Sequence, residues 1–289
     1  MALGAFKRLG LFLLTNFLVV MTLTIIMSIL GIRIADYSGL LVLCAVFGFA
    51  GSLISLLLSK TIAKWSYKIQ LIDRSNATGR YLNLFEAIEQ MAAHLGIKTP
   101  QVGIYPSADI NAFATGATAN GALIAFSSAI IERLDDPELA AVAGHELSHV
   151  TNGDMVTMTL LTGVANTFVM FFARIIASMI SNRDNEGGGL GYMGYFLIVM
   201  VLENILMLLA YIPISAFSRW REFGADGGAA QLTGPMPMIT ALQKIDRNYR
   251  PETKKDSFAM AKISSRNRVS LFATHPSIEA RIERLQKLL

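Results

Sequence analysis

Long runs of apolar residues recur four times along the chain. They cover residues 11–32, 38–58, 156–180 and 192–217. Each run reaches the roughly 20 residues that an α-helix needs to cross about 30 Å of hydrocarbon. The first run follows Lys7 and Arg8, but it is longer than the roughly 7–15 apolar residues of a secretory signal. The pattern therefore predicts four membrane-spanning helices, with an uncleaved anchor at the N-terminus.

The third and fourth runs are interrupted by polar residues, notably Arg174 and Glu203. Ionisable side chains are costly in hydrocarbon and usually face a partner or a watery cavity. We expect a hairpin of two helices in which Arg174 pairs with Glu203. The alternative is that both helices lie partly against the water-exposed part of the chain and do not fully span. The polar, glycine-rich residues 181–191 between them are typical of an exposed loop.

Basic residues at the ends of the apolar runs predict the orientation. Lys7 and Arg8 precede the first run, and Lys60, Lys64 and Lys68 follow the second. Because basic residues in short flanks collect on the cytoplasmic side, the N-terminus and the segment after the second run should both be cytoplasmic. The second hairpin would then return the chain to the cytoplasm.

Composition supports a membrane protein. Charged residues make up 16% of the 289 residues, whereas water-soluble proteins average about 25%, and the mean hydropathy is +0.48. The single cysteine, Cys44, cannot form an internal disulfide, and we expect it to pack or face lipid within its apolar run. Positive charge gathers at the ends of the apolar runs, so we expect no nucleic-acid partner.

Residues 141–154 read AVAGHELSHVTNGD and contain the pattern His-Glu-x-x-His. Signals for the start and end of a helix surround it. Asp135 or Asp136 is a suitable N-cap, Pro137 suits the first turn, and Gly153 is placed to end the helix in a left-handed conformation. We therefore expect a helix of about four turns that carries the whole pattern.

On that helix, His145 and His149 are one turn apart and project from the same face. Two imidazole rings so placed can bind one metal ion, and zinc is the usual choice for such ligands. Glu146 lies roughly 100° further round the axis, where it can hold a water molecule beside the metal and take its proton. The alternative is a helix whose polar face carries two histidines by chance.

A catalytic zinc site needs a third protein ligand on the same side of the membrane. Residues 218–226 (SRWREFGAD) begin where the fourth apolar run ends. Glu222 in this segment can bind zinc. Asp226, one turn later, can accept a hydrogen bond from the free ring nitrogen of a ligand, with His145 as the first candidate. The alternative is an ordinary charged helix face at a membrane exit, which the two arginines of the segment would suit.

The chain contains, in order, HELSH followed by NGD, then SRWREFGAD and ATHPS. Taken together, these motifs resemble the HtpX group of membrane zinc endopeptidases, which are related to the CAAX prenyl proteases. The resemblance covers nearly the whole chain. It implies that His145, His149 and Glu222 bind one Zn²⁺ and that Glu146 is the general base and acid. It also implies an active site facing the cytoplasm at the bacterial inner membrane. The implied role is a stress response that degrades unfolded, damaged or misassembled membrane proteins.

Candidate substrate-binding residues lie in NAFATG, which begins with Asn111, Ala112 and Phe113. The following residues 121–127 (GALIAFS) predict a short β-strand, and a helix then leads to the His-Glu-x-x-His pattern. In related metallopeptidases the strand in this place is an edge strand, to which an extended substrate can add as an antiparallel strand. The alternative is that Asn111 only fixes a turn.

Two further residues are candidates for supporting roles. His275, in THPS, is a candidate for stabilising the oxyanion of the transition state, by the resemblance and by analogy with sites where a remote histidine donates to it. The plainer interpretation is a structural cap before a last helix from Pro276 onward. The apolar face of that helix would carry Ile278, Ile282 and Leu285. Asp154 either orients a ligand or closes the turn after the His-Glu-x-x-His helix.

These features predict a mainly α-helical integral membrane protein with a zincin-like α+β metallopeptidase domain, in which a short edge-stranded sheet packs on the His-Glu-x-x-His helix. Residues 1–60 would form an N-terminal transmembrane hairpin, and residues 156–217 a second transmembrane or membrane-associated hairpin. Residues 61–155 and 218–289 would together form the cytoplasmic catalytic domain. Two other functions stay open, a prenyl-protein-type C-terminal processing protease and a non-catalytic zinc-binding membrane scaffold. The sequence predicts no oligomeric state.

Overall fold

The structure is a computed structural model that describes residues 34–181, 191–248 and 271–289. The first predicted membrane helix, residues 11–32, lies outside the described residues, as does most of the predicted loop at 181–191.

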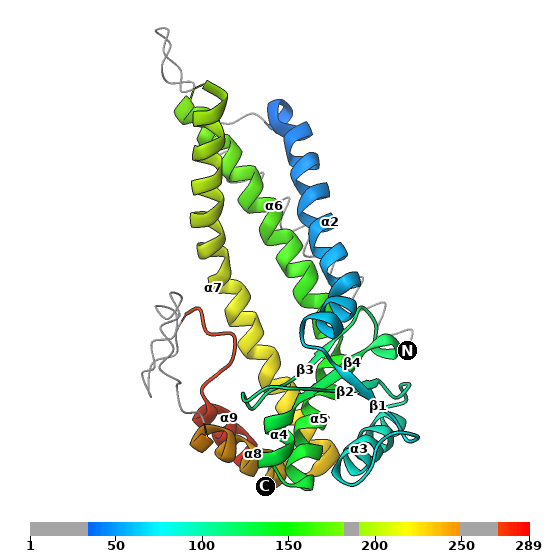
Figure 1. Ribbon diagram of the computed structural model, residues 1–289. Coiled ribbons are helices and arrows are strands. Elements are labelled where there is room, and N and C mark those ends of the chain that lie inside the picture. Colours follow the sequence, from blue (N-terminus) through cyan, green and yellow to red (C-terminus); the bar gives the residue numbers. More distant parts are fainter. Residues whose placement is uncertain (1–33, 182–190, 249–270) are drawn as a thin grey trace. The chain divides into compact units, whose positions relative to one another are not determined.

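The chain divides into two compact units. The helical unit comprises Met1–Ser55 and Thr157–Ile214, and the sheet unit comprises Leu56–Val156 and Ser215–Leu289. Three long helices contribute residues to both units (Figure 1), and they are α2 (Ile34–Ser66), α6 (Asp154–Ser181) and α7 (Gly191–Thr233). All three are long and apolar enough to cross a membrane by length and composition. The helices predicted at 38–58, 156–180 and 192–217 are therefore confirmed as helices.

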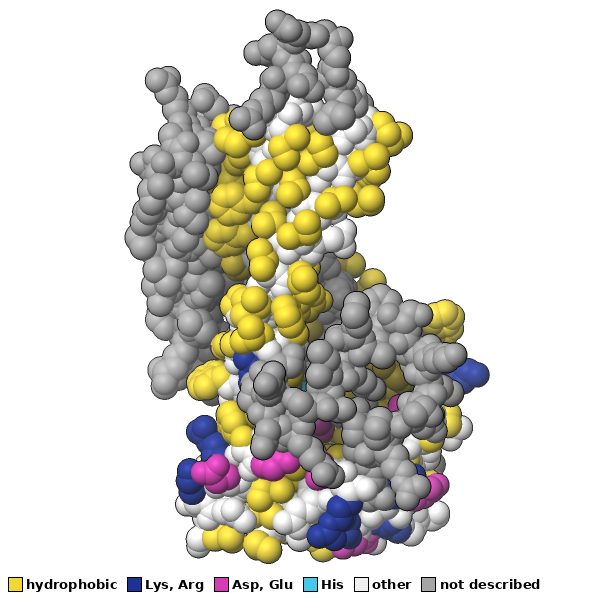
Figure 2. Space-filling model, turned by 90° about the vertical axis from the view of Figure 1, so that its left-hand side faces the viewer, with side chains coloured by type: hydrophobic (Ala, Val, Ile, Leu, Met, Phe, Trp, Pro, Cys, Tyr) yellow, Lys and Arg dark blue, Asp and Glu magenta, His cyan; other side chains and the backbone are white. Residues whose placement is uncertain are grey.

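Hydrophobic side chains cover much of the surface of the helical unit. Val42 is 63% exposed, Phe47 60% and Leu209 55%. Figure 2 shows such side chains spread over the long helices, while the Lys, Arg, Asp and Glu side chains in view gather over the sheet unit. A surface with this much exposed apolar area is suited to lipid rather than water.

Inside the helical unit, the helices pack through small and aromatic residues. Cys44 on α2 is fully buried against Phe171 and Ile175 of α6, so it is a packing residue. The guanidinium of Arg174 on α6 donates to the carboxylate of Glu203 on α7 over 2.7 Å. The predicted pair across the hairpin is therefore confirmed, and it compensates two charges that would each be costly in hydrocarbon.

The sheet unit contains a four-stranded mixed sheet. The strands are β1 (Gln70–Ile72), β2 (Gln101–Tyr105), β3 (Ala112–Thr115) and β4 (Leu123–Ser127), in the order β1-β2-β4-β3. β2 and β4 are parallel, and the two outer pairs are antiparallel.

The predicted strand at 121–127 is β4, but the expectation that it forms the edge of the sheet is wrong. β4 pairs on both sides, with β2 and with β3. The edge strands of the described sheet are β1 and β3. Among the described residues, β3, which is formed by the AFAT of NAFATG, pairs with β4 alone. The alanine-rich β3 has a weak strand propensity, so its pairing is decided by tertiary context that the sequence pattern does not carry.

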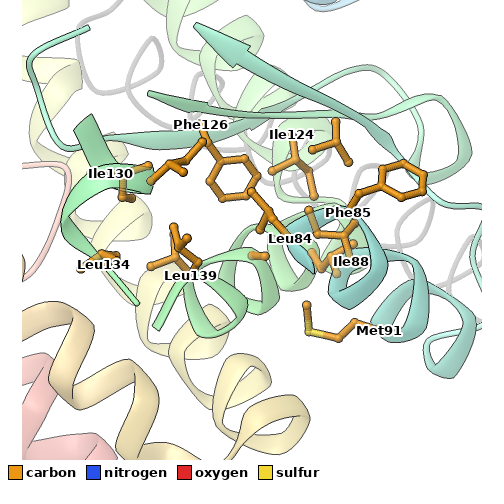
Figure 3. Close-up of a cluster of buried hydrophobic side chains, with 14 of the residues drawn as sticks. Leu84, Phe85, Ile88, Met91, Ile124, Phe126, Ile130, Leu134 and Leu139 are labelled. Atoms are coloured by element: carbon orange, nitrogen blue, oxygen red, sulfur yellow. The ribbon is translucent and has the colours of Figure 1, made fainter. Parts of the chain in front are cut away.

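The helices of the sheet unit pack in two layers against one central helix, α5 (Asp136–Asn152). The other helices are α3 (Arg80–His94), α4 (Ser128–Arg133), α8 (Pro235–Asn248) and α9 (Ile278–Gln286), with a short 3₁₀ turn at Ala119–Gly121. The first core lies between one face of the sheet and helices α3 and α5 (Figure 3). It contains Leu84, Phe85, Ile88, Ile124, Phe126 and Leu139.

A second core lies on the other side of α5. There Ala141 of α5 packs with Ala229 of α7, Leu242 of α8 and Leu285 of α9. The predicted apolar face of the last helix is confirmed, since Ile278 and Ile282 pack against the same cluster. Because α5 is covered on both sides, its polar side chains are held in fixed positions inside the protein.

Candidate metal centre

The helix that carries the His-Glu-x-x-His pattern is fixed at both ends. At the start of α5, the Asp135 side chain accepts a hydrogen bond from the Glu138 amide, and the Glu138 side chain accepts one from the Asp135 amide. This reciprocal capping box satisfies two of the free amides at the helix start. Gly153 ends the helix with φ 70°, a left-handed conformation that glycine adopts without strain. The predicted start and end of this helix are confirmed.

α7 brings a carboxylate against the two histidines of α5. Glu222 is 1% exposed, and His145 and His149 are 6% and 7% exposed. The close approach of the two helices depends on Gly228 of α7. A Cβ atom at Gly228 would lie 2.8 Å from the Cβ atom of Ser148 on α5, which is closer than two such atoms can approach. Glycine at this position therefore lets α7 pack tightly enough to bring Glu222 to the histidines.

Three potential ligand side chains converge between the helices. The Nε2 atom of His145 lies 3.4 Å from Oε2 of Glu222, and that of His149 lies 3.3 Å from Oε1. The two Nε2 atoms are 3.2 Å apart. In a tetrahedral zinc site with bonds of about 2.0–2.2 Å, neighbouring ligand atoms are separated by about 3.3–3.5 Å. The observed separations match the spacing of three ligands round one zinc ion.

The carboxylate of Glu222 also fits a metal ligand. Among the residues that the structure describes, neither of its buried oxygens accepts a well-aligned hydrogen bond, although three imidazole rings come within 2.9–3.4 Å. A buried carboxylate that accepts no well-aligned hydrogen bond is costly. A divalent cation bound by both histidines would compensate this charge, so the residues present fit zinc.

Two outer carboxylates determine which nitrogen of each histidine faces the centre. Asp226 Oδ1 lies 3.0 Å from Nδ1 of His145. Asp154 Oδ2 lies 2.6 Å from Nδ1 of His149. A carboxylate at Nδ1 keeps the proton there and leaves Nε2 free to bind metal. The structure thus places Asp226 beside the histidine that the sequence suggested, and it places Asp154 beside the candidate ligand His149 rather than in a turn alone.

The electrostatics of the cluster favour positive charge. Burial by itself lowers the pKa of His149, but the carboxylates of Asp154 and Glu222 outweigh that effect and raise it to about 9. The pKa of His145 is also raised, because the nearby carboxylates of Asp226 and Glu222 outweigh its burial. A site that holds a proton this tightly has an excess of negative charge, as a cation-binding site requires.

Arg281 is a buried residue of this centre that the sequence analysis did not identify. It is 9% exposed, and its Nε and Nη2 atoms donate to the two oxygens of Asp226 over 2.8 and 2.6 Å. Its Nη2 also lies 3.5 Å from Nδ1 of His145. The available signal was its position on α9. Arg281 falls between Ile278 and Leu285 on the face of the last helix that was expected to be wholly apolar.

Glu146, the candidate base, is 8% exposed and follows His145 on α5. Its charge contributes to the raised pKa values of both histidines, so it lies close to them. In the part of the chain that the structure describes, its carboxylate accepts no hydrogen bond from the protein. It therefore retains its capacity to accept a hydrogen bond from a water molecule.

His275 lies at the open side of the centre. Its Nδ1 atom is 2.9 Å from Oε2 of Glu222, and its ring is 62% exposed. The cap of α9 is Ser277, whose side chain accepts a hydrogen bond from the Ala280 amide. The ring of His275 is therefore not the cap that the plainer interpretation suggested. Arg219 holds the segment before His275 by donating to the carbonyls of Leu271 and Ala273.

The candidate substrate residues lie on the edge strand next to α5. The amide of Asn111 donates to Ser127 Oγ, and its carbonyl accepts from the Ser127 amide, so this backbone is part of the sheet. Ala112 and Phe113 begin β3. β3 packs against α5, so the edge strand and the metal centre share the same helix.

The chain is similar to a protein family, to named relatives and to a solved structure. The family model described as Peptidase family M48 matches residues 80–289. The protein named Protease HtpX from Aeromonas hydrophila is 47% identical, over 97% of this chain and 99% of its own. The one from Haemophilus influenzae strain PittGG is 45% identical, over 97% and 99%. The crystal structure of S. mikatae Ste24p shares the fold, with a TM-score of 0.60 and 19% identity over 95% of this chain and 66% of that chain.

Proposed function

The chain belongs to peptidase family M48 and, within it, to the HtpX proteases, and on that premise we propose that it degrades misfolded or damaged membrane proteins. It is a membrane metalloprotease. The proposed centre holds one zinc ion per chain at His145, His149 and Glu222. The observation that carries this proposal is the convergence of two Nε2 atoms and one buried carboxylate at the spacing of zinc ligands.

The side chains of the centre have separate tasks. A bound zinc ion would polarise the scissile carbonyl and make a water molecule more acidic. Glu146 accepts the proton of the attacking water and later donates it to the leaving amine. Asp226 and Asp154 hold the two imidazole rings in the required tautomer. His275, exposed beside Glu222, donates to the carbonyl oxygen as negative charge develops on it.

An extended peptide is the proposed form of the substrate. It would add to the open edge of β3 as an antiparallel strand, with hydrogen bonds to the backbone of Ala112 and Phe113. Backbone pairing of this kind requires an unfolded segment but reads little sequence. It suits an enzyme that acts on damaged proteins of many sequences.

The proposed topology is a multi-pass protein of the bacterial inner membrane with its active site facing the cytoplasm. Residues 1–60 and 156–217 are the two membrane hairpins, and residues 61–155 and 218–289 form the catalytic domain. To test this, single cysteines at Gln70 and Glu283 in a Cys44→Ala background are labelled with an impermeant reagent. Both should react only from the cytoplasmic side. Labelling of either residue from the periplasm contradicts the topology.

The activity is tested with the full-length protein purified in detergent. An unfolded protein substrate should be cleaved, and a zinc chelator should stop the cleavage. Glu146→Gln should lower the rate by about 10²–10⁴-fold while the protein still binds zinc. Glu132→Gln, at an exposed glutamate of α4, is the matched control and should retain the activity.

The same assay separates the other functions. Cleavage of a prenylated C-terminal peptide without cleavage of the unmodified unfolded protein would overturn the proposed substrate. Zinc binding without cleavage of either substrate would favour the scaffold.

A further inference from the structure

Both tryptophans of the chain are far more exposed than is usual for this residue. Trp65 on α2 is 82% exposed and Trp220 on α7 is 68% exposed, and the chain has no others. Tryptophan is highly buried on average in water-soluble proteins. When its ring is left exposed, the common setting is a surface that is apolar on one side and wet on the other. Both residues belong to the sheet unit.

Trp220 lies on the side of α7 that turns away from the metal centre. Glu222, Ala225 and Asp226 are buried on one side of this helix. Trp220 lies on the exposed side, and its ring packs against Phe217 with 5.6 Å between ring centroids. Trp220 and Phe217 thus form an aromatic pair on the side of α7 that faces away from the metal centre.

Trp65 stands in a similar setting on α2. Tyr67 beside it is 51% exposed. Lys64 and Lys68 flank it, and the chain carries no acidic residue from position 60 to position 72. Trp220 likewise has an arginine on each side. Each exposed aromatic group therefore has basic neighbours in the sequence, and each belongs to a helix that is long and apolar enough to cross a membrane.

From this combination we propose that Trp65 and Trp220 lie in the headgroup region of a bilayer that contains anionic phospholipids, and that they fix the sheet unit against that surface. Tryptophan and tyrosine collect at the interface because their rings are amphipathic. Lysine and arginine close to the surface gain from the negative charge of anionic lipids. A contact with a second protein copy would explain the exposed rings, but it would not explain why each is flanked by basic side chains.

The position of Trp220 determines the depth of the metal centre. Glu222 follows Trp220 by two residues, a rise of about 3 Å along the helix. If Trp220 is in the headgroup region, the proposed zinc ligand is at nearly the same depth. This step rests on the proposed function. It names the substrate class more closely, as unfolded segments that lie within reach of the membrane surface.

The depth of each tryptophan is measured by fluorescence quenching in proteoliposomes. Trp65→Phe leaves Trp220 as the only tryptophan, and Trp220→Phe leaves Trp65. Lipids carrying a quencher near the headgroup are compared with lipids carrying it near the chain ends. Headgroup-level quenchers should act at least about twofold more strongly on both residues. The unsubstituted protein, which carries both rings, gives the same comparison if either variant fails to fold.

Three outcomes would overturn the proposal. They are stronger quenching by the deep label, quenching only by a water-soluble agent, and protection from lipid-borne and water-soluble quenchers alike. The last result would indicate a protein contact. The basic flanks are tested in the same vesicles, where replacing anionic by zwitterionic lipid should reduce the headgroup-level quenching.

A second measurement separates the depth of the centre from the activity itself. Substrates with a membrane anchor carry an unfolded segment after a flexible spacer of about 5 or about 50 residues. The short spacer should give the faster cleavage. Equal rates with both spacers would contradict the placement of the centre at the surface while leaving the protease activity intact. Absence of all cleavage would contradict the proposed function, and the quenching result would stand by itself.

Discussion

Asp226 Oδ1 lies 3.0 Å from Nδ1 of His145, the ring nitrogen that points away from the metal centre. The contact links a carboxylate of α7 to a proposed ligand of α5. It also means that Glu222 and Asp226, one turn apart on α7, meet opposite nitrogens of the same imidazole ring. One helical turn therefore supplies both a candidate ligand and the group that orients another ligand.

Replacing Asp226 should weaken metal binding without removing a ligand. Asp226→Ala leaves the His145 ring free to rotate and to change tautomer, and such outer-shell substitutions cost about 10–100-fold in metal affinity. Competition with a chromophoric zinc chelator measures the change. Asp246→Ala, at an exposed position of α8, is the control and should bind zinc as the unsubstituted protein does. Unchanged affinity in Asp226→Ala would show that the ring is oriented by other contacts.

Arg281 should matter more for stability than its place on a surface helix suggests. Arg281→Met removes the guanidinium from the buried Asp226 carboxylate and leaves it only the contact with His145, and breaking a buried ion pair costs about 3–5 kcal/mol. Arg281→Lys should not restore stability fully, since an ammonium group cannot donate to both carboxylate oxygens in the way a guanidinium does. Thermal unfolding of the zinc-loaded protein in detergent measures both.

Arg284→Met is the matched control for that experiment. Arg284 lies one turn further along α9 and is exposed, with its guanidinium 4.9 Å from the ring centroid of Phe223. Its replacement should change stability by less than about 1 kcal/mol. Equal losses at Arg281 and Arg284 would mean that the buried contact with Asp226 contributes little.

The contrast between α5 and α9 illustrates what the sequence can predict. α5 was predictable because its cap, its proline and its terminal glycine are local signals, and because two histidines one turn apart restrict the possible chemistry. Glu222 was predicted because a catalytic zinc site needs a third protein ligand. Arg281 could not be found in this way. An arginine among apolar residues is normally solvated, and only the buried carboxylate of Asp226, 55 residues earlier, explains its burial.

The sheet shows which elements the sequence does not predict. β4 was predictable, because its residues are apolar and β-branched. β3 was not, because alanine-rich segments have little strand propensity, and its place at the edge follows only from pairing with β4. β1, β2 and α8 also escaped the analysis. β1 and β2 are short, so their conformations depend on packing partners that lie far away in the sequence. α8 is a clearly amphipathic helix of 14 residues, and its pattern could have predicted it.

Gly228 should be intolerant of any side chain. Gly228→Ala adds a Cβ atom 2.8 Å from the Cβ atom of Ser148 and would push α7 away from α5, at a cost of about 1–3 kcal/mol. Zinc affinity should fall with stability, because Glu222 lies on the displaced helix. Adding Ser148→Gly should recover part of the loss. Unfolding and chelator competition measure both effects.

Gly227→Ala is the neighbouring control. Nothing lies within 4 Å of a Cβ atom at this position, and alanine is favoured over glycine in a helix by about 0.8–1 kcal/mol. Gly227→Ala should therefore leave stability unchanged or raised, with normal zinc affinity. If Gly227→Ala and Gly228→Ala behave alike, the close approach of α5 and α7 at Ser148 is not what determines the position of Glu222.

The pair between Arg174 and Glu203 should stabilise the helical unit only as a pair. Arg174→Met leaves the Glu203 carboxylate without its 2.7 Å partner, and an unpaired charge within the membrane costs about 2–3 kcal/mol. Glu203→Met should cost a similar amount. The double variant removes both charges and should be close to the unsubstituted protein in stability.

Unfolding in mixed detergents, read by circular dichroism, measures the stability of all three variants. Asn204→Met, which removes an amide that, within the described part of the chain, bonds only to the Met200 carbonyl of its own helix, is the control. Additive losses in the double variant would mean that each side chain has an independent role, such as contact with water inside the bundle, and that their mutual attraction does not stabilise the packing of α6 on α7.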